Sequence, residues 1–203
     1  MNDRTDGDKN LLADASGAAL VIIDVQEFSV AANLAPHKGT SVLANSIALA
    51  NACRAAGILV VIITAGGGVR LAHSPDREMP SLAVPPGSHR VPEVLGPMKG
   101  DLSITKYNWG AFFGTSLDLH LRRRGIDTII LCGIATNFGV ESTARQAHER
   151  GYQQIIVDDA ISAFSEDEHE ASLSMTLRRI SRVRSTREIL EQLASGSDRV
   201  ADQ

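Results

Sequence analysis

The chain has 203 residues, of which 43% are hydrophobic, and a formal charge of -4. This length suits one buried core and is short for two, so we predict a single domain over residues 17–194, with disordered tails at 1–16 and 195–203. The slightly acidic balance gives no electrostatic basis for binding nucleic acid or an anionic membrane, and the basic run at 122–124 is typical of a solvated helix end.

Cysteine usage and hydropathy bear on location. The two cysteines, Cys53 and Cys132, fall inside predicted elements, which suits a reducing compartment better than a disulfide framework. No apolar run approaches the roughly 20 residues of a membrane-spanning helix. Residues 1–16 are polar, where a signal peptide would need an apolar core. We therefore expect a cytoplasmic protein without membrane segments.

Four apolar runs predict the central strands, at 19–23, 58–63, 128–132 and 155–157. Each of the last three follows a helical stretch that ends in a glycine of the kind that closes helices in the left-handed conformation. These glycines are Gly57, Gly125 and Gly151. The runs are apolar throughout instead of alternating, which indicates strands covered on both faces.

Two shorter strands are expected at 102–105 and 182–184. Two further helices are predicted from capping boxes, formed by Ser165 with Glu168 and by Ser185 with Glu188. The complete pattern predicts a doubly wound three-layer α/β/α fold with a parallel sheet of about six strands.

The segment 65–101 breaks this rhythm, because it holds six of the seven prolines and three consecutive glycines. A loop of this length in a compact domain is usually functional or disordered. We favour a loop that covers the substrate, because proline restrains the open chain.

Polar residues follow three of the expected strands. Asp24 ends the first, Lys106 ends the strand at 102–105, and residues 136–139 follow the strand at 128–132. Ligands of open parallel sheets bind at the carboxyl ends of the strands, so these residues are the candidates for a site. Taken alone, an aspartate in such a place is more often a cap or turn residue, and a lone lysine is a weaker signal still.

Three motifs occur in order. They are Asp24-Val25-Gln26, then Lys106 ahead of the aromatic-rich stretch 107–113, and then Gly133-Ile134-Ala135-Thr136-Asn137 before a helix. Together they resemble the isochorismatase-like (cysteine hydrolase) superfamily, and the resemblance covers Ala19 to about Leu193. It implies a hydrolase fold and a cis peptide at Ile134–Ala135.

The resemblance also marks a departure at Gly139, where the amidase branch of the superfamily carries its nucleophilic cysteine. In that branch an aspartate, a lysine and the cysteine form a triad, and the thiolate attacks the carbonyl. Glycine cannot do so. Nicotinamidases in this branch hold a metal through an Asp-x-His motif, whereas His73 and His89 lack that spacing. We therefore expect no catalytic metal and no cofactor.

The isochorismatase branch resembles this chain in having glycine at that position. Hydrolysis of an enol ether needs no covalent intermediate, because an acid protonates carbon and water captures the oxocarbenium ion. Asp24 is the candidate acid: burial would raise its pKa and the Lys106 ammonium would lower it. This chain departs from that branch at one position, because isochorismatases resemble one another in carrying histidine where it has Asn137. A dianionic substrate also needs cations, for which Arg70 and Arg77 are candidates.

The predicted catalytic residues are Asp24, Lys106 and Gly139. The predicted substrate-binding residues are Gln26, Arg70, Trp109, Phe112, Ile134, Ala135, Asn137 and Phe138. The aromatic cluster within 107–113 either walls the pocket or packs in the core or at a subunit interface. The expected partners are a small-molecule substrate and further copies of the chain in a dimer or tetramer, with Arg145 a candidate for pairing across subunits.

Three functional interpretations remain from the sequence. The first is a hydrolase that acts through Asp24 and Lys106 with direct attack by water. The second is an amide or carbamoyl hydrolase with an unrecognised nucleophile, although Cys132 lies in an apolar run where a thiol is an inert packing group. The third is an inactive binding protein of the same fold. Retention of both charged residues favours an enzyme, because a buried ion pair adds little stability on its own.

Overall fold

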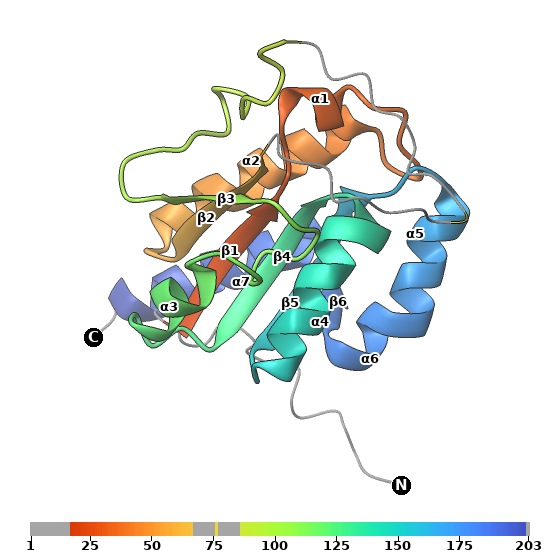
Figure 1. Ribbon diagram of the computed structural model, residues 1–203. Helices are drawn as coiled ribbons and strands as arrows, with labels where there is room; N and C mark the ends of the chain where they lie inside the picture. Colours follow the sequence, from red (N-terminus) through yellow and green to blue (C-terminus); the bar gives the residue numbers. More distant parts are fainter. Residues whose placement is uncertain (1–16, 67–75, 77–85, 202–203) are drawn as a thin grey trace, which may run out of the picture.

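The computed structural model describes residues 17–66, 76 and 86–201. Its centre is a sheet of six parallel strands in the order β3-β2-β1-β4-β5-β6 (Figure 1). The strands are β1 (Ala18–Ile23), β2 (Leu59–Ala65), β3 (Leu102–Lys106), β4 (Thr128–Ile134), β5 (Gln153–Ser162) and β6 (Arg182–Arg184). The predicted parallel sheet of about six strands is confirmed.

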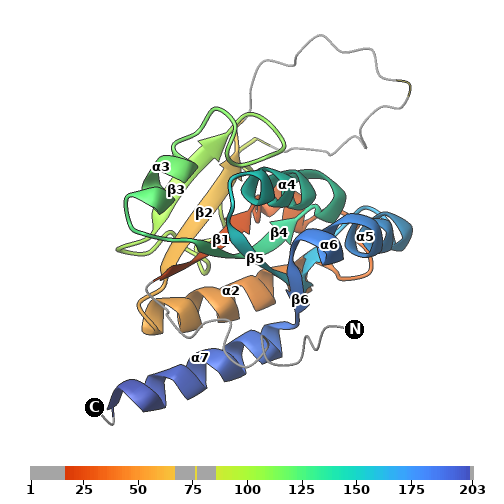
Figure 2. The ribbon, with the colours of Figure 1, turned by 90° about the horizontal axis from the view of Figure 1, so that it is seen from below.

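Helices cover both faces of the sheet. On one face lie α2 (Gly39–Ala55) and α7 (Thr186–Ala201), and on the other lie α3 (Leu117–Arg122), α4 (Glu141–Glu149), α5 (Glu166–Ser172) and α6 (Arg178–Ile180) (Figure 2). The short α1 (Glu27–Val30) and the π-helical turns η2 (Thr136–Val140) and η3 (Leu173–Leu177) complete the described elements. This is the three-layer arrangement expected from the sequence. Within the described ranges, no helix has the length and apolar character to span a membrane.

Local signals in the sequence produce these boundaries. Gly57, Gly125 and Gly151 have φ angles of 72°, 68° and 79°, so each closes its helix in the left-handed conformation as predicted. Ser185 and Glu188 form the expected capping box, in which the Glu188 N–H donates to Ser185 Oγ at 3.3 Å and the Ser185 N–H donates to Glu188 Oε2 at 2.7 Å. Helix α7 continues to Ala201, through most of the segment 195–203 that the sequence suggested was a tail. Residues 1–16 lie outside the described part.

The chain order reverses direction between β1 and β4. From β1 the chain proceeds outward to β2 and β3, and it then returns to β4 on the other side of β1. Gly133 permits a close approach of these two strands, because a Cβ there would lie 2.0 Å from the Ile23 carbonyl oxygen and its φ of 123° is open to glycine. The carboxyl ends of β1 and β4 therefore meet where a parallel α/β sheet usually binds its ligand.

Strand β5 is longer than the predicted run at 155–157 and is irregular. Its pairing with β4 shifts register, from Leu131 opposite Ile156 to Gly133 opposite Ile161. Such a bulge changes the direction of the side chains within it. Asp158 and Asp159 lie in this stretch and face different neighbours. Asp159 accepts hydrogen bonds from the Thr186 N–H and hydroxyl, both at 2.7 Å, and so caps α7.

Candidate active site

Asp24 is held by the turn that follows β1. Its N–H donates to the Ile63 carbonyl of β2 at 2.9 Å, and its own carbonyl accepts from the Ser29 hydroxyl of α1. Its φ of 51° lies in the left-handed region, where no other described non-glycine residue is found. A conformation of this kind costs on the order of 1 kcal/mol or more, and at functional sites it fixes a side chain in place.

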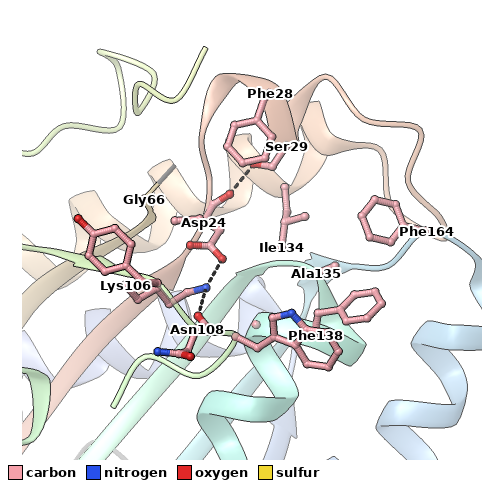
Figure 3. A pocket seen from close by; sticks show the side chains of 14 residues that line it. Asp24, Phe28, Ser29, Gly66, Lys106, Asn108, Ile134, Ala135, Phe138 and Phe164 are labelled. Carbon is pink, nitrogen blue, oxygen red and sulfur yellow. Dashed lines mark hydrogen bonds and ion pairs between the residues drawn. The ribbon is translucent and has the colours of Figure 1, made fainter. Parts of the chain in front are cut away.

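The Asp24 carboxyl pairs with Lys106 at the end of β3. Lys106 Nζ lies 2.6 Å from Asp24 Oδ2, and the two side chains are only 4% and 12% exposed (Figure 3). The ammonium also donates to the Asn108 carbonyl at 3.2 Å. Asp24 Oδ1 is buried and has no hydrogen-bond partner among the described residues. One carboxyl oxygen is thus paired with lysine, and the other has no partner among the described residues.

Burial dominates the titration of this carboxyl. Removal from water raises the pKa of Asp24 to about 6, although the charge and hydrogen bond of Lys106 act in the opposite direction. A pKa of about 6 leaves roughly a tenth of the carboxyl groups protonated at pH 7. The site can therefore supply an acid near neutral pH.

Gly139 lies opposite Asp24, in the turn between β4 and α4. The Ile134–Ala135 peptide at the start of this turn is cis, as the resemblance implied. A Cβ at Gly139 would lie 3.3 Å from Asp24 Oδ2 and 2.9 Å from Ile23 Cγ2. Thr143 fixes the turn, because its hydroxyl donates to the Gly139 carbonyl at 2.6 Å. Any side chain at position 139 would therefore point at the carboxyl.

These groups line one pocket of about 240 Å³ (Figure 3). Its lining consists of Asp24, Phe28, Ser29, Ala65, Gly66, Lys106, Tyr107, Asn108, Trp109, Ile134, Ala135, Phe138, Gly139 and Phe164. The aromatic rings contact one another. The centroids of Trp109 and Phe138 are 4.9 Å apart in an edge-to-face contact, and those of Phe138 and Phe164 are 5.9 Å apart. The pocket therefore has an ion pair at one side and aromatic walls.

Six of the predicted site residues besides Gly139 line this pocket, namely Asp24, Lys106, Trp109, Ile134, Ala135 and Phe138. The structure places three others elsewhere. Phe112 is buried against Tyr152, with the ring centroids 5.6 Å apart. Gln146 Oε1 accepts the Phe112 N–H at 3.1 Å and so holds this segment against α4. Asn137 is half-buried and is not part of the lining. Arg70 and Arg77 lie outside the described residues.

Gln26, the third predicted residue outside the lining, joins two segments of backbone. Its amide donates to the His89 carbonyl at 2.5 Å and to the Ala65 carbonyl at 3.3 Å, while its oxygen accepts the Ala65 N–H at 2.8 Å. The ring of His89 contacts the Phe28 ring, with centroids 5.2 Å apart. His89 thus supports a pocket wall. His73, with the rest of 67–75 and 77–85 in the predicted covering loop, lies outside the described residues.

Sequence reasoning missed the lining residues Phe28, Ser29, Ala65, Gly66, Asn108 and Phe164. Phe164 could have been found, since it follows β5 at the same carboxyl edge as the other candidates. Phe28 and Ser29 lie in α1, directly after the Asp24 motif, and only the tight turn brings them back over the pocket.

Cys132 lies in the middle of β4 and does not line the pocket. Its sulfur is 3.8 Å from the Ser46 hydroxyl of α2, within the layer of helices on the other side of the sheet. Burial raises the pKa of its thiol to about 12. A thiol in this state is a poor nucleophile at neutral pH.

The fold and pocket define a parallel α/β enzyme with a buried carboxyl at the reversal point of its sheet. The family model of the isochorismatase domain matches residues 18–188, and the chain belongs to this family of hydrolases. It is 43% identical over 184 residues to the uncharacterized isochorismatase family protein YecD of Escherichia coli O157:H7, an alignment that covers 89% of this chain and 98% of YecD.

Two further comparisons agree. The isochorismatase of Bacillus subtilis strain 168 is 30% identical over 187 residues, which cover 89% of this chain and 59% of that protein. The solved structure of an isochorismatase family protein from Burkholderia thailandensis superposes with a TM-score of 0.82 at 37% identity, covering 88% of this chain and 96% of that one.

The burial of Cys132 leads to a prediction about thiol chemistry. Iodoacetamide should label Cys132 slowly in the native protein, because its pKa of about 12 leaves almost no thiolate at neutral pH. Cys132→Ala should lower the free energy of unfolding by about 1–2 kcal/mol and leave turnover nearly unchanged. Mass spectrometry of the labelled protein measures the first effect. Rapid labelling with parallel loss of turnover would assign Cys132 a catalytic role.

Proposed function

We propose that this hydrolase acts without a thiol nucleophile and uses Asp24 and Lys106 to cleave an enol ether with direct attack by water. The observation that carries the proposal is the geometry at Gly139, whose missing side chain would point at Asp24 Oδ2 from 3.3 Å. In the amidase branch that the motifs resemble, a cysteine takes this position. Glycine there leaves space beside the carboxyl for a substrate carbon or a water molecule.

The reaction begins with proton transfer. Protonated Asp24 gives its proton to the terminal carbon of the enol ether, and the electron pair of the double bond forms the new C–H bond. Water then adds to the oxocarbenium carbon and loses a proton, which the Asp24 carboxylate can take. The resulting hemiketal breaks its bond to the ether oxygen, which takes up the hydroxyl proton, so that an alcohol leaves and a ketone remains. Water is consumed and Asp24 is regenerated.

Lys106 sets the acid strength of Asp24 in this scheme. Its ammonium is 2.6 Å from Oδ2 and stabilises the carboxylate that forms when the proton leaves. Burial alone would raise the pKa of Asp24 further, and a weaker acid protonates carbon less readily. The two opposing effects leave an acid whose pKa of about 6 is close to neutral pH, the range in which general acids are effective.

The pocket walls favour a substrate with a planar, partly apolar ring. Five aromatic side chains line the pocket, namely Phe28, Tyr107, Trp109, Phe138 and Phe164. Among the described lining residues the charged groups are Asp24 and Lys106, and they neutralise each other. The carboxylates of a dianionic substrate would need cations from elsewhere, for which Arg70 and Arg77 remain the candidates. The similarity to the isochorismatase of Bacillus subtilis makes isochorismate the first compound to test.

A substrate panel with an Asp24 variant tests the proposal. We expect turnover of isochorismate or another acyclic enol ether of a ring alcohol, and Asp24→Asn should reduce kcat at least 100-fold, because it retains the shape and loses the titratable proton. Asp127→Asn, at an exposed position at the opposite end of the sheet, is the matched control and should be unaffected. Stopped assays by chromatography measure product, and melting curves verify that each variant is folded.

The same panel separates the alternatives. Turnover confined to amides or carbamoyl compounds would contradict the proposal in favour of an amidase. Turnover of nothing, with ligand binding retained, would favour an inactive binding protein. Full activity of Asp24→Asn would exclude the assigned acid.

The raised pKa of Asp24 predicts a pH profile. The acid is active when protonated, so kcat/KM should be constant below pH 6 and fall tenfold per unit above it. Lys106→Met removes a positive charge that lowers the pKa of Asp24, so the falling limb should move to higher pH by about 1 unit or more. Rates measured from pH 4.5 to 9 give the plateau and the falling limb for the wild type and for Lys106→Met. A rate that rises through pH 6 would instead make Asp24 a base.

The position of Gly139 predicts the behaviour of an introduced thiol. Gly139→Cys should react with a maleimide faster than free cysteine at pH 7, because Lys106 and the start of α4 favour a thiolate and Asp24 can take its proton. Asp24→Asn in the same background should slow the reaction. Gly139→Ala is the matched control for crowding, and both variants should lose native turnover because a Cβ would lie 2.9 Å from Ile23 Cγ2. Reactivity no greater than that of free cysteine would disprove a vacated thiol position.

A further inference from the structure

A second group of chemically active side chains lies outside the substrate pocket. His37 precedes α2, Asp158 belongs to β5 and His169 to α5, and each offers one atom within 4.8 Å of the other two. None of the three lines the substrate pocket, and the proposed reaction does not use them. Two imidazoles and a carboxylate from three separate segments therefore converge on one point.

His169 is set in one orientation. Its side chain is buried, and Nδ1 lies 2.9 Å from the Thr136 hydroxyl. When Nδ1–H donates to that hydroxyl, the lone pair of Nε2 faces Asp158 Oδ1. Histidines that bind metals usually have this arrangement, with the second ring nitrogen held by an outer hydrogen bond.

The separation of the donor atoms matches a metal site. His169 Nε2 and Asp158 Oδ1 are 3.3 Å apart, which is long for an N–H···O hydrogen bond. Zinc binds histidine nitrogen and carboxylate oxygen at about 2.0–2.2 Å, so ligands at two corners of its tetrahedron are roughly 3.3–3.5 Å apart. Asp158 lies in the irregular stretch of β5 and points at His169, while its neighbour Asp159 caps α7.

His37 is held at the third corner by its backbone. Ala35 and Ala163 exchange two hydrogen bonds of 3.0 Å, and the His37 N–H donates to Ser162 Oγ at 3.2 Å. The His37 ring stands edge to face with the His169 ring, with centroids 5.8 Å apart. His37 and Asp158 are each partly exposed, so an ion can reach the group from solvent.

We propose that His37, Asp158 and His169 bind a divalent transition-metal ion, preferentially Zn²⁺, with water as the fourth ligand. The donor set of two imidazoles and one carboxylate suits Zn²⁺ better than Mg²⁺ or Ca²⁺, which prefer oxygen ligands.

Such an ion would stabilise the fold from a position outside the substrate pocket. It would join the segment before α2 to β5 and α5, and through His169 and Thr136 it would reach the turn that carries Gly139. The proposal is independent of the enol-ether reaction, because it concerns binding and stability.

Titration of the chelator-treated full-length protein with Zn²⁺ in a calorimeter tests this site. We expect one equivalent to bind and the Tm to rise. His37→Ala and Asp158→Asn should each weaken binding by at least about 10-fold, the loss typical even of outer partners of a metal site. Co²⁺ in the same site should show the visible absorption of a tetrahedral complex.

The control is His148→Ala, at an exposed histidine of α4. This variant should bind Zn²⁺ as the wild type does. The proposal is overturned if the wild type binds no zinc, if His37→Ala and Asp158→Asn retain its affinity, or if the control variant loses binding. Because His37 and Asp158 are partly exposed, their replacement leaves the core intact and the protein available for measurement.

Discussion

The buried pair of Asp24 and Lys106 is the interaction on which the site depends. The two residues end β1 and β3, and β2 lies between these strands, so the lysine reaches across a strand to place its ammonium 2.6 Å from the carboxyl. Taking both charges from water is costly, and a buried pair contributes little net stability. Removing one partner leaves the other uncompensated, which typically destabilises a protein by about 3–5 kcal/mol. The pair is therefore explained better by reactivity than by folding.

The surrounding contacts keep this pair in a fixed relation to the turn after β4. Thr143 donates to the Gly139 carbonyl and accepts the Ala111 N–H at 3.1 Å, so one hydroxyl holds both the turn and the segment that follows Lys106. Gln146, one helical turn further along α4, accepts the N–H groups of Phe112 and Phe113. Helix α4 thus holds both the turn that carries Gly139 and the segment that follows Lys106. Rigid second contacts of this kind are what an acid needs to meet its substrate at a constant distance.

Sequence patterns predicted the sheet and the charged centre because both follow from local rules. Continuous apolar runs mark buried strands, and a parallel sheet brings their carboxyl ends together, which was enough to select Asp24 and Lys106. The sequence did not show which aromatic residues of 107–113 line the pocket, because this stretch has no regular period. Trp109 faces the pocket, whereas Phe112 faces Tyr152. The group around His169 was missed for a different reason. Its members come from the segment before α2, from β5 and from α5, and only the fold brings them together.

The side-chain amide of Gln26 affects which changes in sequence length the fold can accept. It binds Ala65 at the end of β2 and the carbonyl of His89, and so it ties together two points of the chain that 23 residues separate in sequence. Loop closure depends only weakly on loop length, so a segment anchored at both ends can be lengthened, shortened or exchanged at little thermodynamic expense. Insertions and deletions there would leave the carboxyl and the lysine untouched. The fold thus separates the buried carboxyl and lysine from a segment whose length can change independently of them.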